Sequence, residues 1–136
     1  MCLAVYFGSD HPVEEVSWVE ERPAFYVEEV NATEPVRKQF SGKYVYYAGS
    51  HEGCGCGFSK DGEPPEELSR CQANYDALGE VLRTAIQQGA RVQVFTCWEG
   101  EQAKEPESIQ FITVNALTEP AYELQQLELL NVGSDA

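Results

Sequence analysis

The chain of 136 residues carries 23 acidic and 9 basic side chains, so its net charge of −14 at pH 7 leaves no surface that could neutralise a phosphate backbone. We therefore expect no nucleic-acid partner, and the same repulsion disfavours anionic membrane surfaces. The length and the 43% share of hydrophobic residues are typical of one soluble, folded domain, which we expect to span residues 1–136.

The cellular setting is predicted from apolar runs and cysteines. No apolar run approaches the ~20 residues that cross a bilayer. Residues 1–7 lack the basic leader of a secretory signal. We expect a cytoplasmic protein whose thiols stay reduced, and the odd number of five cysteines also argues against a complete disulfide framework.

Strand patterns dominate the first third of the chain. Residues 2–7 predict a buried strand, and residues 25–30 predict a second. Residues 10–23 contain two prolines and two Glu-Glu pairs, which favour a short helix or no regular structure. Residues 44–48 are aromatic and β-branched, which indicates a third strand.

A helix from about Pro65 to Gln88 is the best-defined element. Its apolar residues recur at spacings of three and four, as expected of a helix with one face on a core. These residues are Leu68, Cys71, Tyr75, Leu78, Leu82 and Ala85. Proline and acidic residues at its start, and Gly89 after its end, match the preferences of the two helix termini.

Two strands and a helix are predicted beyond this point. Residues 91–98 and 109–114 have strand character, and residues 99–107 join them most simply as a long hairpin loop. Thr118 begins a predicted final helix, with Leu124, Leu127 and Leu130 on one side.

The order of these elements predicts the fold class. Strand, helix and strand across residues 44–98 have the length and pattern of a βαβ unit, whose two strands run parallel. We expect an α+β or α/β fold with a single mixed β-sheet of about five strands, one βαβ unit, and the long helix packed on one face.

A glycine-rich segment after the third strand contains the candidate site. His51 is followed by Cys54 and Cys56 among three glycines, and thiol and imidazole are soft or borderline metal ligands. If the two strands of the βαβ unit are neighbours, their carboxyl ends bring Cys97 to the same edge. Cys2 joins the group only if the first strand runs antiparallel to that pair.

Metal binding is the first interpretation of this pattern. His51, Cys54, Cys56 and Cys97 are the candidate ligands, and sulfur and nitrogen donors of this kind suit Zn²⁺. A single residue between the paired cysteines is less common than the two to four of most structural zinc sites. Two alternatives stay open: a redox-active thiol pair with a strained, labile disulfide, and a tight turn with small structural cysteines.

Other chemistry is less well supported by the residues. The three glycines do not predict a phosphate loop, because the helix begins about eight residues later and acidic residues precede it. Cys71 lies on the apolar stripe of the helix and is predicted to be core.

The block Gly49–Phe58 reads GSHEGCGCGF. With the Met-Cys start and the run Phe95-Thr96-Cys97-Trp98, it resembles an uncharacterised family of small, acidic bacterial proteins. The resemblance covers most of the chain and implies no activity.

Three functional hypotheses remain at this point. The first is a small cytosolic metal-binding or thiol-redox protein. The second is a non-catalytic interaction domain, acting through Tyr44, Tyr46 and Tyr47 on a protein or small-molecule partner. The third is a hydrolase that pairs Cys2 or Cys54 with a histidine. No pattern favours catalysis, and a homodimer is expected only as the commonest assembly of soluble proteins.

Overall fold

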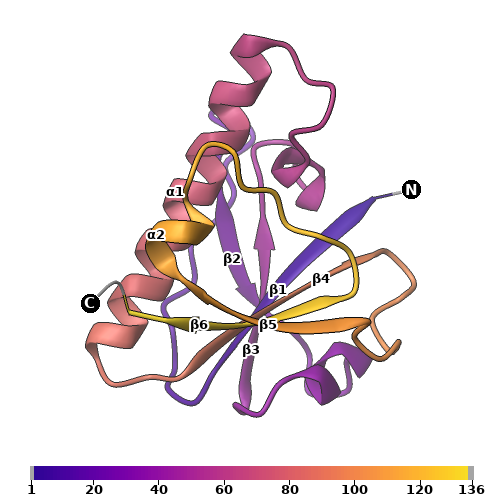
Figure 1. Cartoon of the computed structure of the whole chain (residues 1–136), viewed down its shortest axis with the longest axis vertical. Coiled ribbons are helices and arrows are strands. Elements are labelled where there is room, and N and C mark those ends of the chain that lie inside the picture. The colour runs from indigo at the N-terminus through magenta and orange to yellow at the C-terminus, as the bar shows by residue number, and fades with distance from the viewer. Residues whose placement is uncertain (1, 135–136) are drawn as a thin grey trace.

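Six strands form one mixed sheet in the computed structural model, which describes residues 2–134 (Figure 1). The strands are β1 (Leu3–Ser9), β2 (Tyr26–Glu29), β3 (Tyr44–Gly49), β4 (Val92–Trp98), β5 (Ser108–Thr113) and β6 (Glu128–Gly133). Their order across the sheet is β2-β3-β1-β4-β6-β5. Every neighbouring pair is antiparallel except β5 and β6, which are parallel.

The helices are unequal in length. The long helix α1 (Pro65–Gln87) connects β3 to β4, and the short α2 (Val114–Leu117) follows β5. Two 3-10 turns, η1 (Pro35–Gln39) and η2 (Gly55–Phe58), complete the elements. Within residues 2–134, no helix combines the length and the apolar character that crossing a membrane requires.

The predicted α+β fold is confirmed, with six strands in place of about five. β3 and β4 run in the same direction and are joined by α1, as in a βαβ unit. However, β1 lies between them and is antiparallel to both, so β3 and β4 are not neighbours. The first strand of the chain therefore occupies the middle of the sheet.

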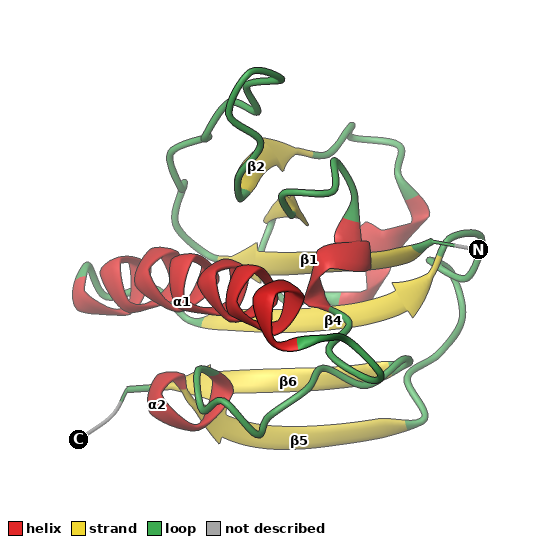
Figure 2. Cartoon of the chain, turned by 90° about the horizontal axis from the view of Figure 1, so that it is seen from above, coloured by secondary structure: helices red, strands yellow, loops and turns green. Residues whose placement is uncertain are grey.

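One face of the sheet is covered by α1 and α2, which lie on the same side of the strands (Figure 2). Pro65 and two glutamates begin α1, and Gly89, at φ +93°, follows its end. The apolar side of the helix packs against alternate residues of β1 and β4. The fully buried members of this cluster include Val5, Phe7, Val94, Tyr75, Leu78 and Leu82.

The other face carries a second buried cluster. It contains the intervening strand residues Ala4, Tyr6, Phe95 and Cys97, because successive side chains point to opposite faces of a strand. Val36 and Phe40, in and after η1, cover this face together with Leu127 and Leu129. Both faces of β1 and β4 are therefore buried.

The last quarter of the chain differs from the prediction. The predicted helix from Thr118 is wrong: the chain turns at Leu127, whose φ of 54° is left-handed, and continues as β6. β6 lies between β4 and β5, so residues 99–107 do not form a hairpin loop between neighbouring strands. Leu130 and Val132 face the helices while Leu129 faces the opposite cluster, which hides the strand alternation in the sequence.

Candidate functional site

Three thiols meet where β1 begins. Cys2 directly precedes β1, Cys54 precedes η2, and Cys56 lies within η2. The three Sγ atoms all lie within 4.8 Å of one another. Because β1 is antiparallel to β3, the start of β1 lies beside the end of β3 and thus beside the glycine-rich loop. The condition under which Cys2 joins the group is met.

Glycines allow the loop to lie against its neighbours. A Cβ at Gly55 would stand 2.3 Å from the carbonyl oxygen of Leu3, at the start of β1. A Cβ at Gly57 would stand 2.3 Å from the hydroxyl oxygen of Ser50. A larger residue at Gly55 would push η2 away from β1, and one at Gly57 would displace the Ser50 side chain. These glycines therefore serve the close approach that unites the thiols.

The buried Ser50 organises the interior of the loop. Its hydroxyl donates to the carbonyl oxygen of Cys54 at 2.6 Å. The same oxygen accepts from the backbone N–H groups of Glu52 (3.1 Å) and Gly57 (3.0 Å). The Ser50 side chain thus hydrogen-bonds to the backbone of three loop residues. These bonds fix the backbone conformation of the segment that carries Cys54 and Cys56.

The far end of the loop is tied to α1 and to the segment before β6. Tyr75 donates its hydroxyl proton to the carbonyl oxygen of Phe58 at 2.6 Å and accepts from the N–H of Leu124 at 3.0 Å. The ammonium of Lys60 donates to the side-chain oxygen of Gln72 at 2.7 Å. It also donates to two backbone carbonyls of residues 120–122. The far end of the loop is therefore anchored both to α1 and to the segment before β6.

The two loop thiols differ in proton affinity. Burial is the main reason that the pKa of Cys54 is raised to about 12; the hydrogen bond from the Cys56 N–H acts to lower the pKa, and the weaker effect of the hydrogen bond to the Cys56 thiol acts to raise it. Burial also acts to raise the pKa of Cys56. There, hydrogen bonds from the Cys54 thiol, the Leu3 N–H and the Cys2 thiol outweigh it and hold the pKa below its ordinary value. Cys56 is the thiol most easily ionised of this pair.

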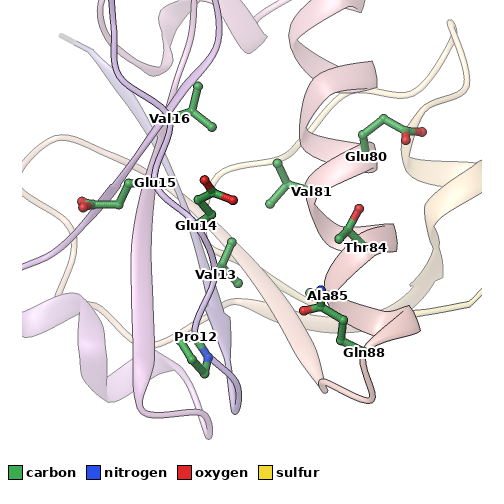
Figure 3. A pocket seen from close by; sticks show the side chains of 10 residues that line it. All are labelled: Pro12, Val13, Glu14, Glu15, Val16, Glu80, Val81, Thr84, Ala85 and Gln88. Atoms are coloured by element: carbon green, nitrogen blue, oxygen red, sulfur yellow. The ribbon is translucent and has the colours of Figure 1, made fainter.

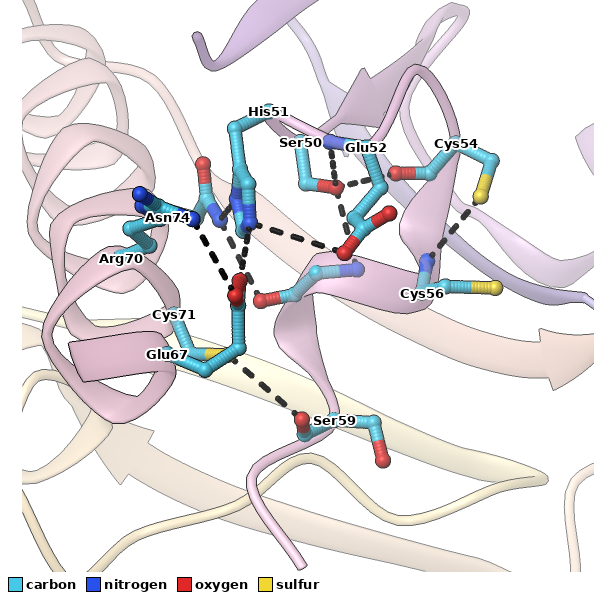
Figure 4. A network of polar contacts seen from close by, with 11 residues as sticks. Ser50, His51, Glu52, Cys54, Cys56, Ser59, Glu67, Arg70, Cys71 and Asn74 are labelled. Carbon is cyan, nitrogen blue, oxygen red and sulfur yellow. Dashed lines mark hydrogen bonds and ion pairs between the residues drawn. The ribbon is translucent and has the colours of Figure 1, made fainter. Parts of the chain in front are cut away.

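His51 lies on the helix side of the loop, away from the sulfur atoms of Cys54 and Cys56 (Figure 4). Its Nδ1 accepts from the Asn74 amide at 2.9 Å, since an amide nitrogen can only donate. The proton of the neutral ring is then on Nε2, which donates to the Glu67 carboxylate at 2.7 Å. The amide of Asn74 also donates to the carbonyl oxygen of Gly57 at 3.2 Å. Two α1 side chains thus engage both ring nitrogens.

Two groups within residues 2–134 could hold a metal ion. One is the thiol group of Cys2, Cys54 and Cys56, and the other is His51 with Glu52 and Glu67. The thiol group offers only soft ligands. In the second group the atom that would bind a metal, His51 Nε2, is the atom that donates to Glu67. The thiol group is therefore the better prepared of the two.

Cys97 has a different place from the one expected. It is fully buried in the cluster opposite the helices and belongs to neither metal-capable group in the described part of the chain. Two features of the sheet cause this: β1 separates β4 from β3, and the position of Cys97 along β4 turns its side chain away from α1. Of the four residues predicted as ligands, the structure unites Cys54 with Cys56.

Sequence reasoning missed Glu67 and Asn74 as partners of the loop. They are seven residues apart on α1, so they lie on the same side of the helix as the buried Cys71. Polar residues next to an apolar stripe are a signal that could have pointed to them. Tyr46, which the sequence offered as a contact residue, is buried and stacks on Phe7 with ring centroids 5.1 Å apart.

Two cavities lie between α1 and the irregular chain before β2. The larger, about 560 Å³, lies between Val13 and Glu14 on the chain before β2 and Glu80, Val81 and Ala85 on α1 (Figure 3). The second, about 540 Å³, reaches His51. No cysteine lines either cavity, so the thiol group is a separate feature of the surface.

Comparisons with known proteins find no counterpart. No protein-family model, curated protein or solved structure matches this chain.

Proposed function

We propose that this protein binds a thiophilic metal ion, Zn²⁺, through Cys2, Cys54 and Cys56. The observation that carries the proposal is the approach of three Sγ atoms to within 4.8 Å of one another. With a Zn–S distance of about 2.3 Å, two sulfurs on a tetrahedral zinc ion stand about 3.8 Å apart. Small side-chain rotations would bring the three thiols to that spacing.

The surroundings of the thiols support an accessible site. Cys2 is exposed, and Cys54 and Cys56 are half-buried, so an ion can reach the sulfurs while the sheet stays intact. Within residues 2–134, the thiol group has no fourth protein ligand in the same range. A bound zinc ion would therefore have one coordination position for water or an external ligand, as in zinc sites that are not purely structural.

His51 supports the site in this proposal without binding the ion. Its contacts with Glu67 and Asn74 hold on α1 the loop that carries Cys54 and Cys56, so their loss would loosen the positions of two of the ligands. Replacement of His51 by Gln should weaken zinc binding by about tenfold while the bound stoichiometry at saturation stays the same.

Zinc content of the purified, reduced chain tests the proposal. After equilibration with Zn²⁺ and gel filtration, elemental mass spectrometry should find about one zinc per chain, as expected of one group of three thiol ligands. Cys56→Ser should lose most of it. Cys97→Ser, which changes a buried thiol outside the group, is the matched control and should retain it. Absence of zinc from the wild type, or equal loss in the two variants, would refute the three-thiol site.

Thiol–disulfide exchange is a second candidate function, favoured by the lowered pKa of Cys56 beside the Cys54 thiol. The Cys56 thiolate would attack a small-molecule disulfide and release one thiolate. A neighbouring thiol would then displace the second and form an internal disulfide. Treatment with oxidised glutathione, followed by peptide mapping, separates the candidates: a disulfide at Cys56 in a chain that binds no zinc supports exchange.

A further inference from the structure

The two edges of the sheet differ in how well they are protected. β2 forms one edge; it has four residues, of which Glu28 and Glu29 are exposed. An additional bridge between Val16 and Val27 covers part of this edge. Short length, charge and covering chain are the usual means by which proteins prevent an edge strand from pairing with another molecule.

β5 forms the other edge and has none of these means. Its six residues, Ser108–Thr113, include no charged residue and no proline. Along one side it pairs with β6, and the other side is the end of the sheet. Ile109 and Phe111 are 62% and 74% exposed, which makes them the most exposed large hydrophobic side chains in residues 2–134. Such a strand is predisposed to pair with another chain.

The two exposed apolar side chains project from the same face of β5. Ile109 is paired with Leu129, and Phe111 lies two residues further along, so both project on the face away from α1. The ring of Phe111 reaches over Gly133, where a Cβ would meet it at 2.6 Å. Gly133 thereby makes room for the ring, which lies over β6 and presents a flat apolar surface beside the edge.

We propose that two copies of this chain pair through β5 in an antiparallel, two-fold symmetric dimer with one continuous sheet. Two copies of a chain of net charge −14 repel each other, and this repulsion is smallest where the facing surfaces carry no charge, as the residues of β5 do not. β5 can also pair with a second copy of itself. Its outer edge has backbone N–H and C=O groups without a strand partner among the described residues, and its Ile109 and Phe111 can pack against the same residues of the other chain. This inference is independent of the proposed metal site.

One register satisfies both packing and charge. With Gln110 opposite its own copy, Ile109 of each chain lies opposite Phe111 of the other, and such aromatic–aliphatic pairs stabilise sheets. In the same register Glu107 lies opposite Thr113, so no carboxylate directly faces another along the pairing. In this antiparallel two-fold pairing, the β5 edge of each chain is occupied by the β5 edge of the other. No β5 edge is left for a third chain, so the assembly closes at two chains.

Sedimentation velocity of the full chain over a wide concentration range tests the dimer. The mass should rise from 15.2 kDa to twice that value. Phe111→Lys should raise the dissociation constant at least ~100-fold, because each lysine faces the apolar surface of the other chain. Val19→Lys is the matched control: it makes the same charge change at a position that is 43% exposed outside β5, and it should leave the constant within about twofold.

Hydrogen exchange supplies a second measurement. Backbone amides of β5 should become more protected as concentration rises, while those of β2 should not. Should Phe111→Lys disturb the fold by circular dichroism, Ile109→Lys provides the same test. A chain that stays monomeric at millimolar concentration, a dimer broken by Val19→Lys but not by the β5 variants, or open-ended assembly would each overturn the proposal.

Discussion

Cys56 and Cys54 are separated by one residue yet have opposite acid–base character. Cys56 has a pKa below its ordinary value of 9.0, whereas the pKa of Cys54 is raised to about 12. The thiolate is the nucleophile in alkylation, so the two residues should differ in reactivity at neutral pH. This contrast is a property of the folded loop, because both thiols have similar surroundings in an unfolded chain.

We predict that iodoacetamide at pH 7.5 modifies Cys56 at least ~10 times faster than Cys54 in the reduced, metal-free protein. Peptide mapping by mass spectrometry over a time course measures both rates in one sample. In denaturant the difference should disappear. Faster modification of Cys54 in the folded protein would show that the hydrogen bonds to the Cys56 sulfur are absent in solution.

The position of Cys97 illustrates what single residues do not disclose. Both faces of β4 are buried, so the strand has no alternation of polar and apolar residues that would tell which way the Cys97 side chain points. The loop cysteines were easier to anticipate because adjacent glycines and a short spacing place them together whatever the sheet order is. The contribution of Cys2 depended on the direction of β1, and that direction is set by pairing partners far along the chain.

At the scale of elements, α1 acts as the support of the candidate site. Its Glu67 accepts from His51, and this hydrogen bond is the main reason that the pKa of Glu67 lies below its ordinary value of 4.5. A carboxylate with a lowered pKa in the folded state stabilises the fold above its unfolded pKa. The stabilisation is lost as the pH falls through the folded pKa.

We therefore predict that Glu67→Gln removes part of the acid dependence of stability. Urea unfolding of the wild type should show a free energy of unfolding that declines as the pH falls below about 4.5, with a shallower decline in the variant. Glu66→Gln, one residue away in the same first turn and exposed, is the control and should retain the wild-type slope. Identical slopes in all three proteins would contradict a structural role for the His51–Glu67 contact.

Elements differ in how far the sequence predicts them. The bounds of α1 were predicted to within one residue, because an apolar stripe, Pro65 and Gly89 all agree. The last helix was predicted wrongly, since Leu124, Leu127 and Leu130 have a helical spacing by coincidence. The left-handed turn at Leu127 and the pairing of β6 with two strands outweigh local preference.

At the scale of the whole molecule, acidic charge opposes compactness. Folding brings 23 carboxylates and 9 basic groups into a smaller volume, and like charges repel more strongly there. At 0.01 M ionic strength the Debye length is about 30 Å, comparable to the size of a small domain, whereas at 0.15 M it is about 8 Å. Screening should therefore stabilise the folded state.

We predict that raising NaCl from 0.01 M to 0.15 M increases the free energy of unfolding by about 1 kcal/mol, which raises the melting temperature by ~3 °C. Scanning calorimetry at one low protein concentration, where the chain stays monomeric, measures the shift. KCl should give the same rise, since screening does not depend on the cation. A rise with one salt only would indicate specific ion binding.

Strand order was the part of the fold least accessible to sequence. The α+β class and the long helix follow from local patterns, whereas the insertion of β1 between β3 and β4 depends on contacts between distant segments. Residues 3–9 predict a buried strand, but nothing in them shows that this strand lies between β3 and β4 and not beside only one of them. The same limit applies to β6, whose partners begin 36 and 20 residues earlier in the chain.

The late insertion of β6 also bears on how this sheet is assembled. β4 and β5 leave the ribosome first and are held two strand spacings apart, about 10 Å, in the finished sheet. Until residues 128–133 emerge, β4 and β5 are free to pair directly as a β-hairpin. This pairing is non-native, so its hydrogen bonds must break before β6 can insert between the two strands. The connection over residues 99–107 must therefore leave room between β4 and β5 for β6. Direct pairing of β4 with β5 would delay folding.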